Sequence, residues 1–513
     1  MSKILGTAIL IALFLSCCAP GKKIETAAPQ ADASAEIASA EALYQKGCFV
    51  PLKQAFLIYE DLYSRPELKK RVAARLAVTA LLLTLREKEL GIVNQTYIDR
   101  AIAVIRQNPA LNAYMPYAEL AGVFWVQGKG VMRDIDQRFS GRGVEEKLKK
   151  PEADLLLRAR GDEFFAYMYA VWKCAFSSPF EEKADLPAVW ALFPDSLLLK
   201  YKRAICPRED ENLLREIVAA EPQFYEAEYG LGNLAMSRGL LISAEEHYLK
   251  AHEGIPESAQ ITISLASISF ATEELDKSLE FYDKTLAIAP EYRDALLGKA
   301  ICLSYLGRPV EAIAACEKII GLGYWLLGES NYWLAWNQHE LKDNKAARLS
   351  IEEAKGRLPT SSEVFTLSGL IALEEGDLAK AEKDLKEALQ YNPVNSDALL
   401  HLGNLYARKL DWQNSGVHFE KAALALTEDE STLQKKMAEI EKSSMAPARK
   451  ERLLKIKLSQ AAKVRLTKAT AFYNAAAGYY NAGQKFKALE MAARAAEHPT
   501  LKQKAEELMS GIK

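Results

Sequence analysis

The sequence predicts an all-α protein, a solenoid of stacked helix–turn–helix units. The stretch 225–423 reads as one unit copied six times. A proline recurs at intervals of 34 residues, at Pro222, Pro256 and Pro290 and again at Pro359 and Pro393. Hydrophobic residues make up 49% of the chain and charged residues 26%, which is a globular composition. A fixed period of this length is typical of arrays in which each unit buries its apolar face against its neighbours.

The first 17 residues have the parts of an export signal. A basic start, Met1–Lys3, precedes the apolar run Ile4–Leu15, which is too short to span a membrane as a helix. Ser16, Cys17 and Cys18 follow, and this arrangement resembles a bacterial lipoprotein signal, in which a small residue precedes the lipidated cysteine. We therefore expect residues 1–17 to be a lipoprotein signal peptide, with Cys17, or alternatively Cys18, as the lipid attachment site. An ordinary signal peptide cleaved nearby is the other interpretation.

This resemblance also implies a location. Several acyl chains on one cysteine would hold the protein firmly at a membrane. Neither Cys18 nor Ala19 is the aspartate that retains lipoproteins at the inner membrane of well-studied bacteria. We therefore expect a protein anchored by lipid to the outer membrane and facing the periplasm. Residues 18–33, rich in Ala, Pro and Lys, are predicted to be a flexible tether.

Residues 34–190 return to helical periodicity without a clean repeat. Lys69–Leu90 is predicted to be a long helix, and Ala153–Phe176 another with a dense aromatic stripe. At helical spacing such a stripe is typical of a core rather than of a cofactor pocket. Scattered glycines in the charged stretch Gln127–Lys150 predict an exposed loop. This part of the chain is interpreted as a region of degenerate helical repeats.

The regular array, residues 191–426, has small residues where two helices of a unit would cross. In the clearest copy these are Gly232, Ala244 and Ala251, and Tyr248 is the large residue between them. Small residues at these positions let the helix backbones approach closely. Gly239, Gly307 and Gly376 are predicted to end first helices in the left-handed conformation that glycine tolerates.

This pattern resembles the tetratricopeptide repeat family, strongly over about 200 residues and loosely over about 350. The resemblance implies a right-handed superhelix. Some copies depart from the family pattern: Thr285 and Ile319 stand where a small residue is usual, and one extra residue precedes the fourth copy.

Residues 427–468 interrupt the array as a charged helical insertion. From Leu433 to Lys468 there are eleven Lys and Arg residues against three Glu, and Pro447 is predicted to divide two helices. Ser431 or Thr432 is the expected helix cap. The basic segment is either a patch for an acidic partner or anionic lipid, or a solvated helix face. Residues 469–513 are interpreted as a final repeat with a capping helix.

Five cysteines lie beyond the signal, at Cys48, Cys174, Cys206, Cys302 and Cys316. An exported protein can form disulfides, and Cys302 and Cys316 lie on the two predicted helices of one unit, where they could meet. The other interpretation is that all five are small buried hydrophobic residues.

Motifs for catalysis are absent from the sequence. There is no HExxH, GxSxG or strand-flanked GxGxxG, and the six histidines have no metal-ligand spacing. The sequence therefore predicts a protein that is not an enzyme and that uses no cofactor or metal. A net charge of −2 argues against a wholly basic nucleic-acid binder, and we expect no nucleic-acid partner.

The predicted binding surface is the concave groove, which in the resembling family is lined by the first helix of each unit. The corresponding residues are mostly apolar or aromatic. They are Tyr229, Asn233, Met236, Ile263, Phe270, Leu297, Ile301, Tyr305, Tyr332, Trp336, His339, Leu370, Asn404 and Arg408. Lysines and arginines that would clamp a C-terminal carboxylate are missing at the corresponding places. The alternative is that neighbouring repeats or the N-terminal helices bury these side chains.

These observations favour a membrane-anchored periplasmic scaffold that binds protein partners in envelope assembly, secretion or export. A peptide or helical segment would lie in the groove. The alternative is a binding component that presents a small apolar ligand to a transporter, which a closed pocket framed by the N-terminal aromatic helices would favour. A hydrolase or transferase would need convergent polar residues in a cleft.

Overall fold

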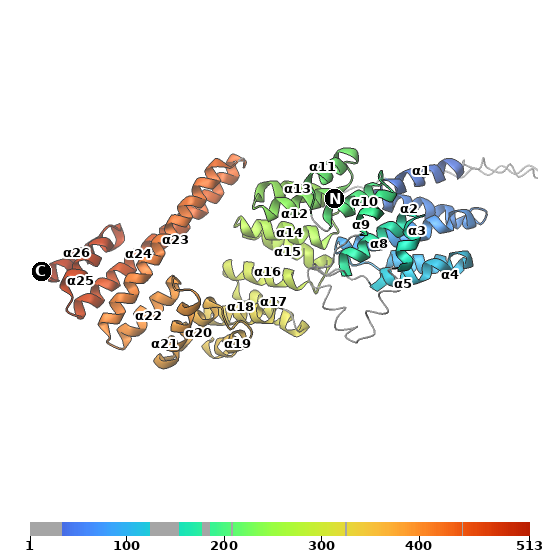
Figure 1. Cartoon of the computed structure of the whole chain (residues 1–513). Helices are drawn as coiled ribbons and strands as arrows, with labels where there is room; N and C mark the ends of the chain where they lie inside the picture. Colours follow the sequence, from blue (N-terminus) through green and yellow to red (C-terminus); the bar gives the residue numbers. More distant parts are fainter. Residues whose placement is uncertain are drawn as a thin grey trace, which may run out of the picture.

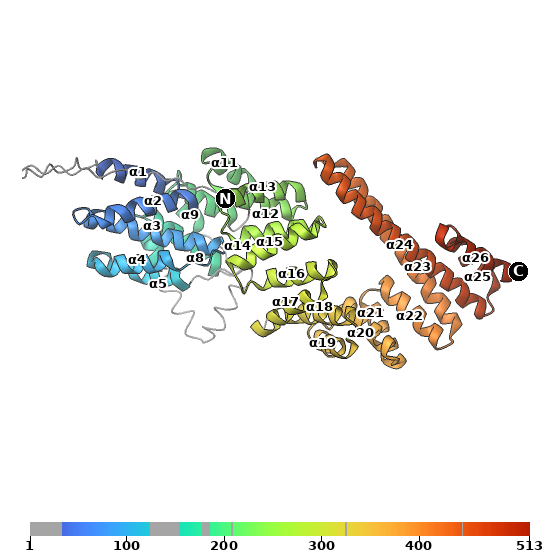
Figure 2. The same ribbon diagram turned by 180° about the vertical axis from the view of Figure 1, so that it is seen from behind.

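The computed structural model describes residues 33–123, 153–176, 185–206, 209–323, 326–443 and 445–512, and all regular structure in these ranges is helical (Figures 1 and 2). The predicted signal peptide, nearly all of the tether, and the loop at 127–150 lie outside the described residues. None of the described helices is long and apolar enough to cross a membrane.

The N-terminal region is a bundle of short helices around α3 (Figure 1). Its helices are α1 (Ala33–Gln45), α2 (Phe49–Ser64), α3 (Lys69–Glu89), α4 (Thr96–Gln107), η1 (Pro109–Tyr114), α5 (Met115–Val123), a helix at 153–159, α8 (Glu163–Phe176), α9 (Leu186–Leu192), α10 (Leu197–Ile205) and α11 (Glu211–Ala220). The aromatic stripe of α8 lies in the core, because Phe164, Tyr167, Tyr169 and Trp172 are all buried. The stripe is thus core, as its helical spacing predicted.

The array is a run of antiparallel helix pairs, and the fold is an all-α tetratricopeptide-type helical repeat. Its helices are α12 (Tyr225–Ser237), α13 (Leu241–Gly254), α14 (Ala259–Ala271), α15 (Leu275–Ile288), α16 (Arg293–Tyr305), α17 (Pro309–Leu322), α18 (Leu327–Glu340), α19 (Asn344–Arg357), α20 (Ser362–Glu375), α21 (Leu378–Tyr391) and α22 (Ser396–Arg408).

Close packing explains the small residues of each unit. A Cβ added at Gly369 would lie 2.6 Å from Leu385 Cγ, and one at Gly403 would lie 2.8 Å from the ring of Phe419. Both distances are shorter than carbon atoms tolerate, so in these two units a side chain at the crossing would force the second helix to shift. The glycines predicted to end first helices have positive φ, for example 73° at Gly239 and 86° at Gly376.

The C-terminal part is a long helical hairpin followed by two short helices. They are α23 (Trp412–Lys442), α24 (Pro447–Asn481), α25 (Lys485–Ala496) and α26 (Pro499–Ile512). Pro447 begins α24 as predicted, in the first turn where its missing N–H is tolerated. The predicted domain boundaries at 426/427 and 468/469 lie inside α23 and α24. Ser431 and Thr432 are also inside α23, so the expectation that one of them caps a helix is wrong.

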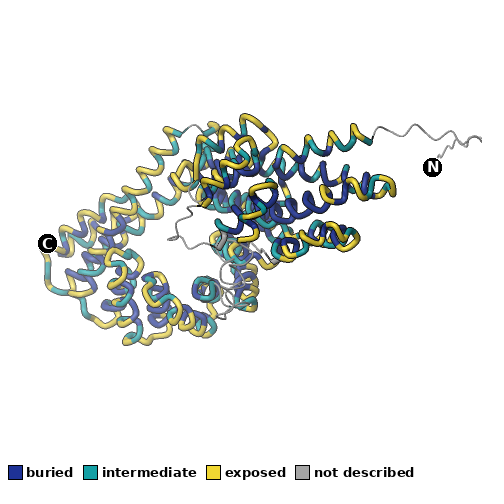
Figure 3. The backbone as a smooth tube through the Cα atoms, turned by 45° about the vertical axis from the view of Figure 1, so that its right-hand side comes forward, coloured by how far each residue is buried: buried dark blue, intermediate teal, exposed yellow. Residues whose placement is uncertain are grey.

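The α23–α24 hairpin, which contains the basic segment, folds back onto the beginning of the array. Arg449 Nη2 lies 3.0 Å from Glu274 Oε2, although 175 residues separate the two. In the view of Figure 3 the array and the hairpin surround an opening, and these side-chain contacts join its two ends. Part of the basic segment therefore has an acidic partner within its own chain.

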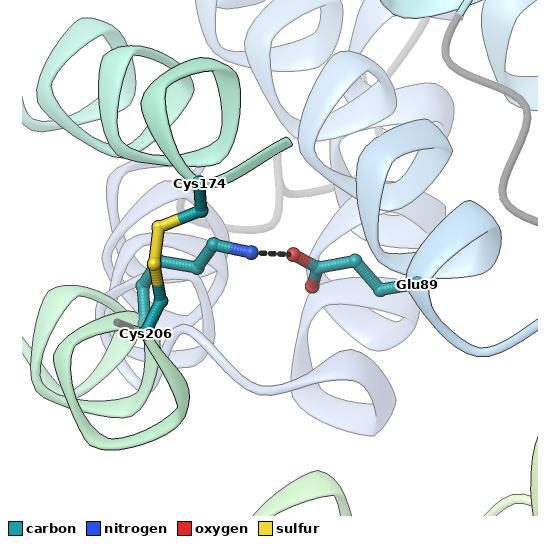
Figure 4. Close-up of a disulfide and its surroundings, with 4 residues drawn as sticks. Glu89, Cys174 and Cys206 are labelled. Atoms are coloured by element: carbon teal, nitrogen blue, oxygen red, sulfur yellow. Dashed lines mark hydrogen bonds and ion pairs between the residues drawn. A yellow bond between two sulfur atoms is a disulfide. The ribbon is translucent and has the colours of Figure 1, made fainter. Parts of the chain in front are cut away.

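A disulfide joins Cys174 to Cys206, linking the end of α8 to the end of α10, beside the ion pair of Lys202 with Glu89 (Figure 4). The pairing of Cys302 with Cys316 that the sequence left open does not occur, because both thiols are free and buried. Cys302 Sγ instead donates to Ser278 Oγ at 3.3 Å. Cys48 is likewise a free, buried thiol, so three of the five cysteines are small core residues.

Candidate functional site

Five aromatic side chains from three successive first helices touch one another along the array. We call them the aromatic ladder: Phe270 on α14, Tyr305 on α16, and Tyr332, Trp333 and Trp336 on α18. The ring centroids of Phe270 and Tyr305 are 6.0 Å apart, and those of Tyr305 and Trp333 are 5.8 Å apart. Within α18, Trp333 lies 5.3 Å from Tyr332 and 6.3 Å from Trp336. These are the separations at which aromatic pairs attract.

The ladder is open to solvent along part of its length. Tyr305 is 63% exposed and Trp336 is 37% exposed, whereas Phe270, Tyr332 and Trp333 are half-buried. Exposed tyrosine and tryptophan side chains are rigid and offer large apolar area. Burial raises the pKa of the Tyr332 hydroxyl, so this residue stays neutral at physiological pH.

A buried amide fixes the two helices that carry most of the ladder. Asn337 Nδ2 donates to Ser304 Oγ at 2.8 Å and to the carbonyl oxygen of Trp333 at 2.6 Å. Asn337 is almost completely buried, and leaving its amide without partners there would be costly. The bond to Ser304 therefore sets the register of α18 against α16 and keeps Tyr305 beside Trp333.

Residues predicted at the start of the groove take part in packing of the array. Tyr229 lies 5.5 Å from the ring of Tyr248, whose hydroxyl donates to Asn233 Oδ1 at 2.7 Å. Met236 and Ile263 are partly buried against the main hydrophobic core. The alternative of burial by neighbouring helices thus describes these side chains better than an open groove does. Leu297, Ile301 and Leu370 are half-buried.

The far end of the predicted groove is polar. His339 is only 7% exposed, and its Nε2 lies 3.0 Å from Glu374 Oε2, so it is held in the structure rather than offered to a ligand. Burial would raise the pKa of Glu374, but hydrogen bonds from Asn344 and His339 lower it overall. Asn404 and Arg408 are exposed, and Arg408 Nη1 donates to the Leu373 carbonyl oxygen at 2.6 Å.

Trp333 belongs to the ladder although the sequence did not single it out. It occupies none of the groove positions that the family resemblance supplies, yet it joins Tyr305 to the rings of α18. The adjacent aromatics Tyr332 and Trp333, with Trp336 one turn later, were the available signal, since residues three and four apart share a helix face.

No group of three or more His, Cys, Asp or Glu side chains in the described ranges could hold a metal ion. The ladder itself contributes aromatic rings, tyrosine hydroxyl groups and indole N–H groups. Such a surface can bind a partner by apolar and aromatic contact.

The comparisons with known proteins agree with this class of fold. The sequence model of the tetratricopeptide repeat family matches residues 366–430. The human protein O-mannosyl-transferase TMTC1 is 26% identical over 219 residues, which are 41% of this chain and 24% of the relative. Anaphase-promoting complex subunit 7 of Dictyostelium discoideum is 23% identical over 292 residues, covering 55% of this chain and 46% of the relative. The chain thus spans between a quarter and half of the length of these curated relatives.

A similar solved structure is YrrB, described as a tetratricopeptide repeat protein with an unusual peptide-binding site. It is 25% identical and covers 36% of this chain and 93% of its own, with a TM-score of 0.30.

Proposed function

We propose that this protein is a scaffold whose aromatic ladder binds a segment of a protein partner. The single observation that carries the proposal is the contiguous row of five rings, which contact one another across three repeats and include the exposed Tyr305 and Trp336. Contiguous apolar surface is unfavourable in water and commonly marks an interaction site. Tryptophan and tyrosine are also the residues that most often dominate binding energy at interfaces.

The chemistry of the ladder specifies the partner segment. The five side chains are uncharged, and Asn337 and Ser304 below them are also neutral. A segment with apolar or aromatic anchors, extended or helical, matches this surface.

The second part of the proposal is a lipid anchor. The basic start, the apolar run Ile4–Leu15 and the Ser16-Cys17 pair support lipidation at Cys17, with Cys18 as the alternative. We propose an outer-membrane protein that faces the periplasm and acts in envelope assembly, secretion or export. Metabolic labelling with a clickable palmitate analogue tests the anchor: Cys17→Ala should remove the label and Cys18→Ala should keep it. The reverse result assigns Cys18, and absence of label from the natural protein would refute the anchor.

The alternative, presentation of a small apolar ligand to a transporter, requires space among the N-terminal aromatic helices. Phe164, Tyr167 and Tyr169 are essentially inaccessible to solvent and fill the core. This packing favours the scaffold over the ligand carrier.

Photo-crosslinking in the native organism tests the scaffold. A crosslinking amino acid replaces Trp336, and a control replaces Lys250, which is exposed on α13. We expect a discrete adduct from position 336 only, identified by mass.

The identified partner is then titrated in purified form. Trp336→Ala should weaken binding about thirtyfold or more, the size of a dominant interface contact. Leu349→Ala, an exposed control on α19, should leave the affinity unchanged. Equal adducts from both positions, or normal binding by Trp336→Ala, would contradict the proposal.

A further inference from the structure

The tip of the α23–α24 hairpin meets the turns of the first two regular units through charged side chains. Arg449 pairs with Glu245 and Glu274, and Arg452 also pairs with Glu274. Lys457 pairs with Glu273, whose second carboxylate oxygen accepts from Gln460 Nε2 at 3.0 Å. In every pair the basic residue comes from α24 and the acidic one from α13 or from the turn between α14 and α15. This junction therefore has one positive and one negative side.

The acidic side is built to receive cations. The side chains of Glu245 and Glu274 are only 5% and 3% exposed in this structure. Burial would raise the pKa of Glu245, yet ion pairs with Lys277 and Arg449 lower it overall. Carboxylates that lie this close together in a buried place repel each other unless cations compensate them.

The backbone conformation of Glu273 also indicates that the acidic side is adapted to contact α24. Its φ is +59°, at the turn position where three other units carry Gly239, Gly307 and Gly376 and two carry Lys342 and Leu410. A left-handed conformation costs a residue with a side chain roughly 1–2 kcal/mol. The side chain of Glu273 makes two of the contacts to α24, so an acidic residue at this strained position has a use that glycine would not have.

The junction is polar and incompletely filled. Between the hairpin and the turns lies a cleft of about 590 Å³. Apolar side chains from both sides line it, among them Leu240, Ile242, Ile440, Met445 and Leu453. Although Glu245 and Glu274 are buried, their partners Arg449 and Arg452 are 21% and 58% exposed beside this cleft, so water and salt reach the cationic side of the contact and can weaken it.

We propose that the α23–α24 hairpin is a latch: the contacts of Arg449, Arg452 and Lys457 with Glu245, Glu273 and Glu274 close the solenoid into a ring and restrict access to the aromatic ladder. The proposal puts the ladder on the inner face of the ring, as the resemblance to tetratricopeptide repeats implies for the first helix of each unit. A free chain end can reach it while the latch is closed, whereas an internal segment of a folded partner requires an open latch. The restriction of access rests on the proposed binding function, but the latch itself does not.

Distance measurements on the full chain test the latch without any partner. Spin labels on noncanonical amino acids replace Leu249 on α13 and Lys455 on α24, which are both exposed. We expect a narrow distance distribution at low salt. The double variant Arg449→Glu, Lys457→Glu should show a broader distribution, centred at a longer distance between the two labels. High salt should act in the same direction, because about 1 M salt shortens the screening length to about 3 Å.

Two controls separate latch opening from misfolding. Lys463→Glu reverses an exposed charge on the same helix and should leave the distances unchanged. Lys457→Glu alone should populate the open form, and adding Glu273→Lys should restore the closed one. The latch is refuted if the double reversal leaves the distances unchanged or the swap fails to restore them. It is also refuted if sedimentation shows that the hairpin docks on a second copy in a dimer.

Access to the ladder is measured with the crosslinked partner. A latch that is open a tenth of the time lowers the apparent affinity about tenfold, so the double-reversal variant should bind a folded partner about tenfold more tightly. Unchanged affinity in a variant whose distances do lengthen would overturn the restriction of access. Trp336→Ala tests the binding function itself, because it should weaken binding about thirtyfold or more in both the open and the closed form.

Discussion

Leu410 shows how a single backbone angle affects stability at the turns of the array. It has φ of +60° and an exposed side chain, at the register where Gly376 and Gly483 stand in other units. We predict that Leu410→Gly stabilises the protein by about 0.5–1 kcal/mol, because relief of left-handed strain exceeds the chain entropy that glycine adds. Urea denaturation would measure the gain. Leu424→Gly, an exposed control in mid-helix, should destabilise by about 1 kcal/mol. A loss of stability in Leu410→Gly would contradict the prediction.

Glu87 makes the stability of the folded protein depend on pH. Burial raises its pKa to about 7, although the hydrogen bond from Asn94 opposes the shift. A carboxyl group whose pKa is raised in the folded state contributes its stability fully below about pH 4.5, and this contribution is lost as pH rises through about 7. Glu87→Gln should therefore raise the melting temperature more at pH 8 than at pH 5. Glu451→Gln, which changes an exposed carboxylate, is the control. Equal gains at both pH values would refute the assignment.

At the scale of elements, the disulfide between α8 and α10 constrains a segment of the N-terminal region. Its cysteines are 32 residues apart, and closing a loop of this size stabilises a protein by about 3.7 kcal/mol. Cys174→Ser and Cys206→Ser should each lower the melting temperature, and the double variant should be no worse than either single one. A reducing agent should lower the melting temperature of the natural protein and leave the double variant unchanged. Equal sensitivity of both to reductant would mean that the bond does not form.

The same scale shows what the sequence could and could not predict. The helix pairs were predictable because the glycines, alanines and prolines of each unit repeat at close-packed positions. The α23–α24 hairpin was not predictable. Beyond Leu426 the side chains of α23 become exposed, so the sequence loses its helical spacing of apolar residues. The helix nevertheless continues, because no glycine or proline ends it there. The ladder was predictable in part: Phe270, Tyr305, Tyr332 and Trp336 follow the repeat register. Trp333 lies outside that register, and only its aromatic neighbours on the same helix pointed to it.

Two junctions organise the whole molecule, and they differ in physical character. The N-terminal bundle meets the array through buried groups: Arg86 Nη2 lies 2.6 Å from Glu226 Oε1, and both side chains are 1% exposed. Ser258 Oγ, also buried, donates to the Leu90 carbonyl oxygen at 2.6 Å. At the hairpin junction Glu274 is buried, but its partner Arg449 is 21% exposed and the junction borders a cleft. The hairpin side is therefore the one expected to open, while the N-terminal bundle and the first units move as one body.

A double-mutant cycle at Arg86 and Glu226 tests this rigidity. Removing one member of a buried ion pair leaves an uncompensated charge and costs about 3–5 kcal/mol. Arg86→Met should therefore accelerate amide exchange in both α3 and α12, because the two helices lose the same contact. The double variant Arg86→Met, Glu226→Leu should recover part of the lost stability, because no unpaired Glu226 charge remains. Glu89 stays paired with Lys202 at 2.7 Å in both variants. Arg452→Met at the hairpin is the contrast, and it should leave exchange in α3 unchanged. If Arg86→Met affected α3 alone, the bundle and the array would be separate bodies, and opening could no longer be assigned to the hairpin side.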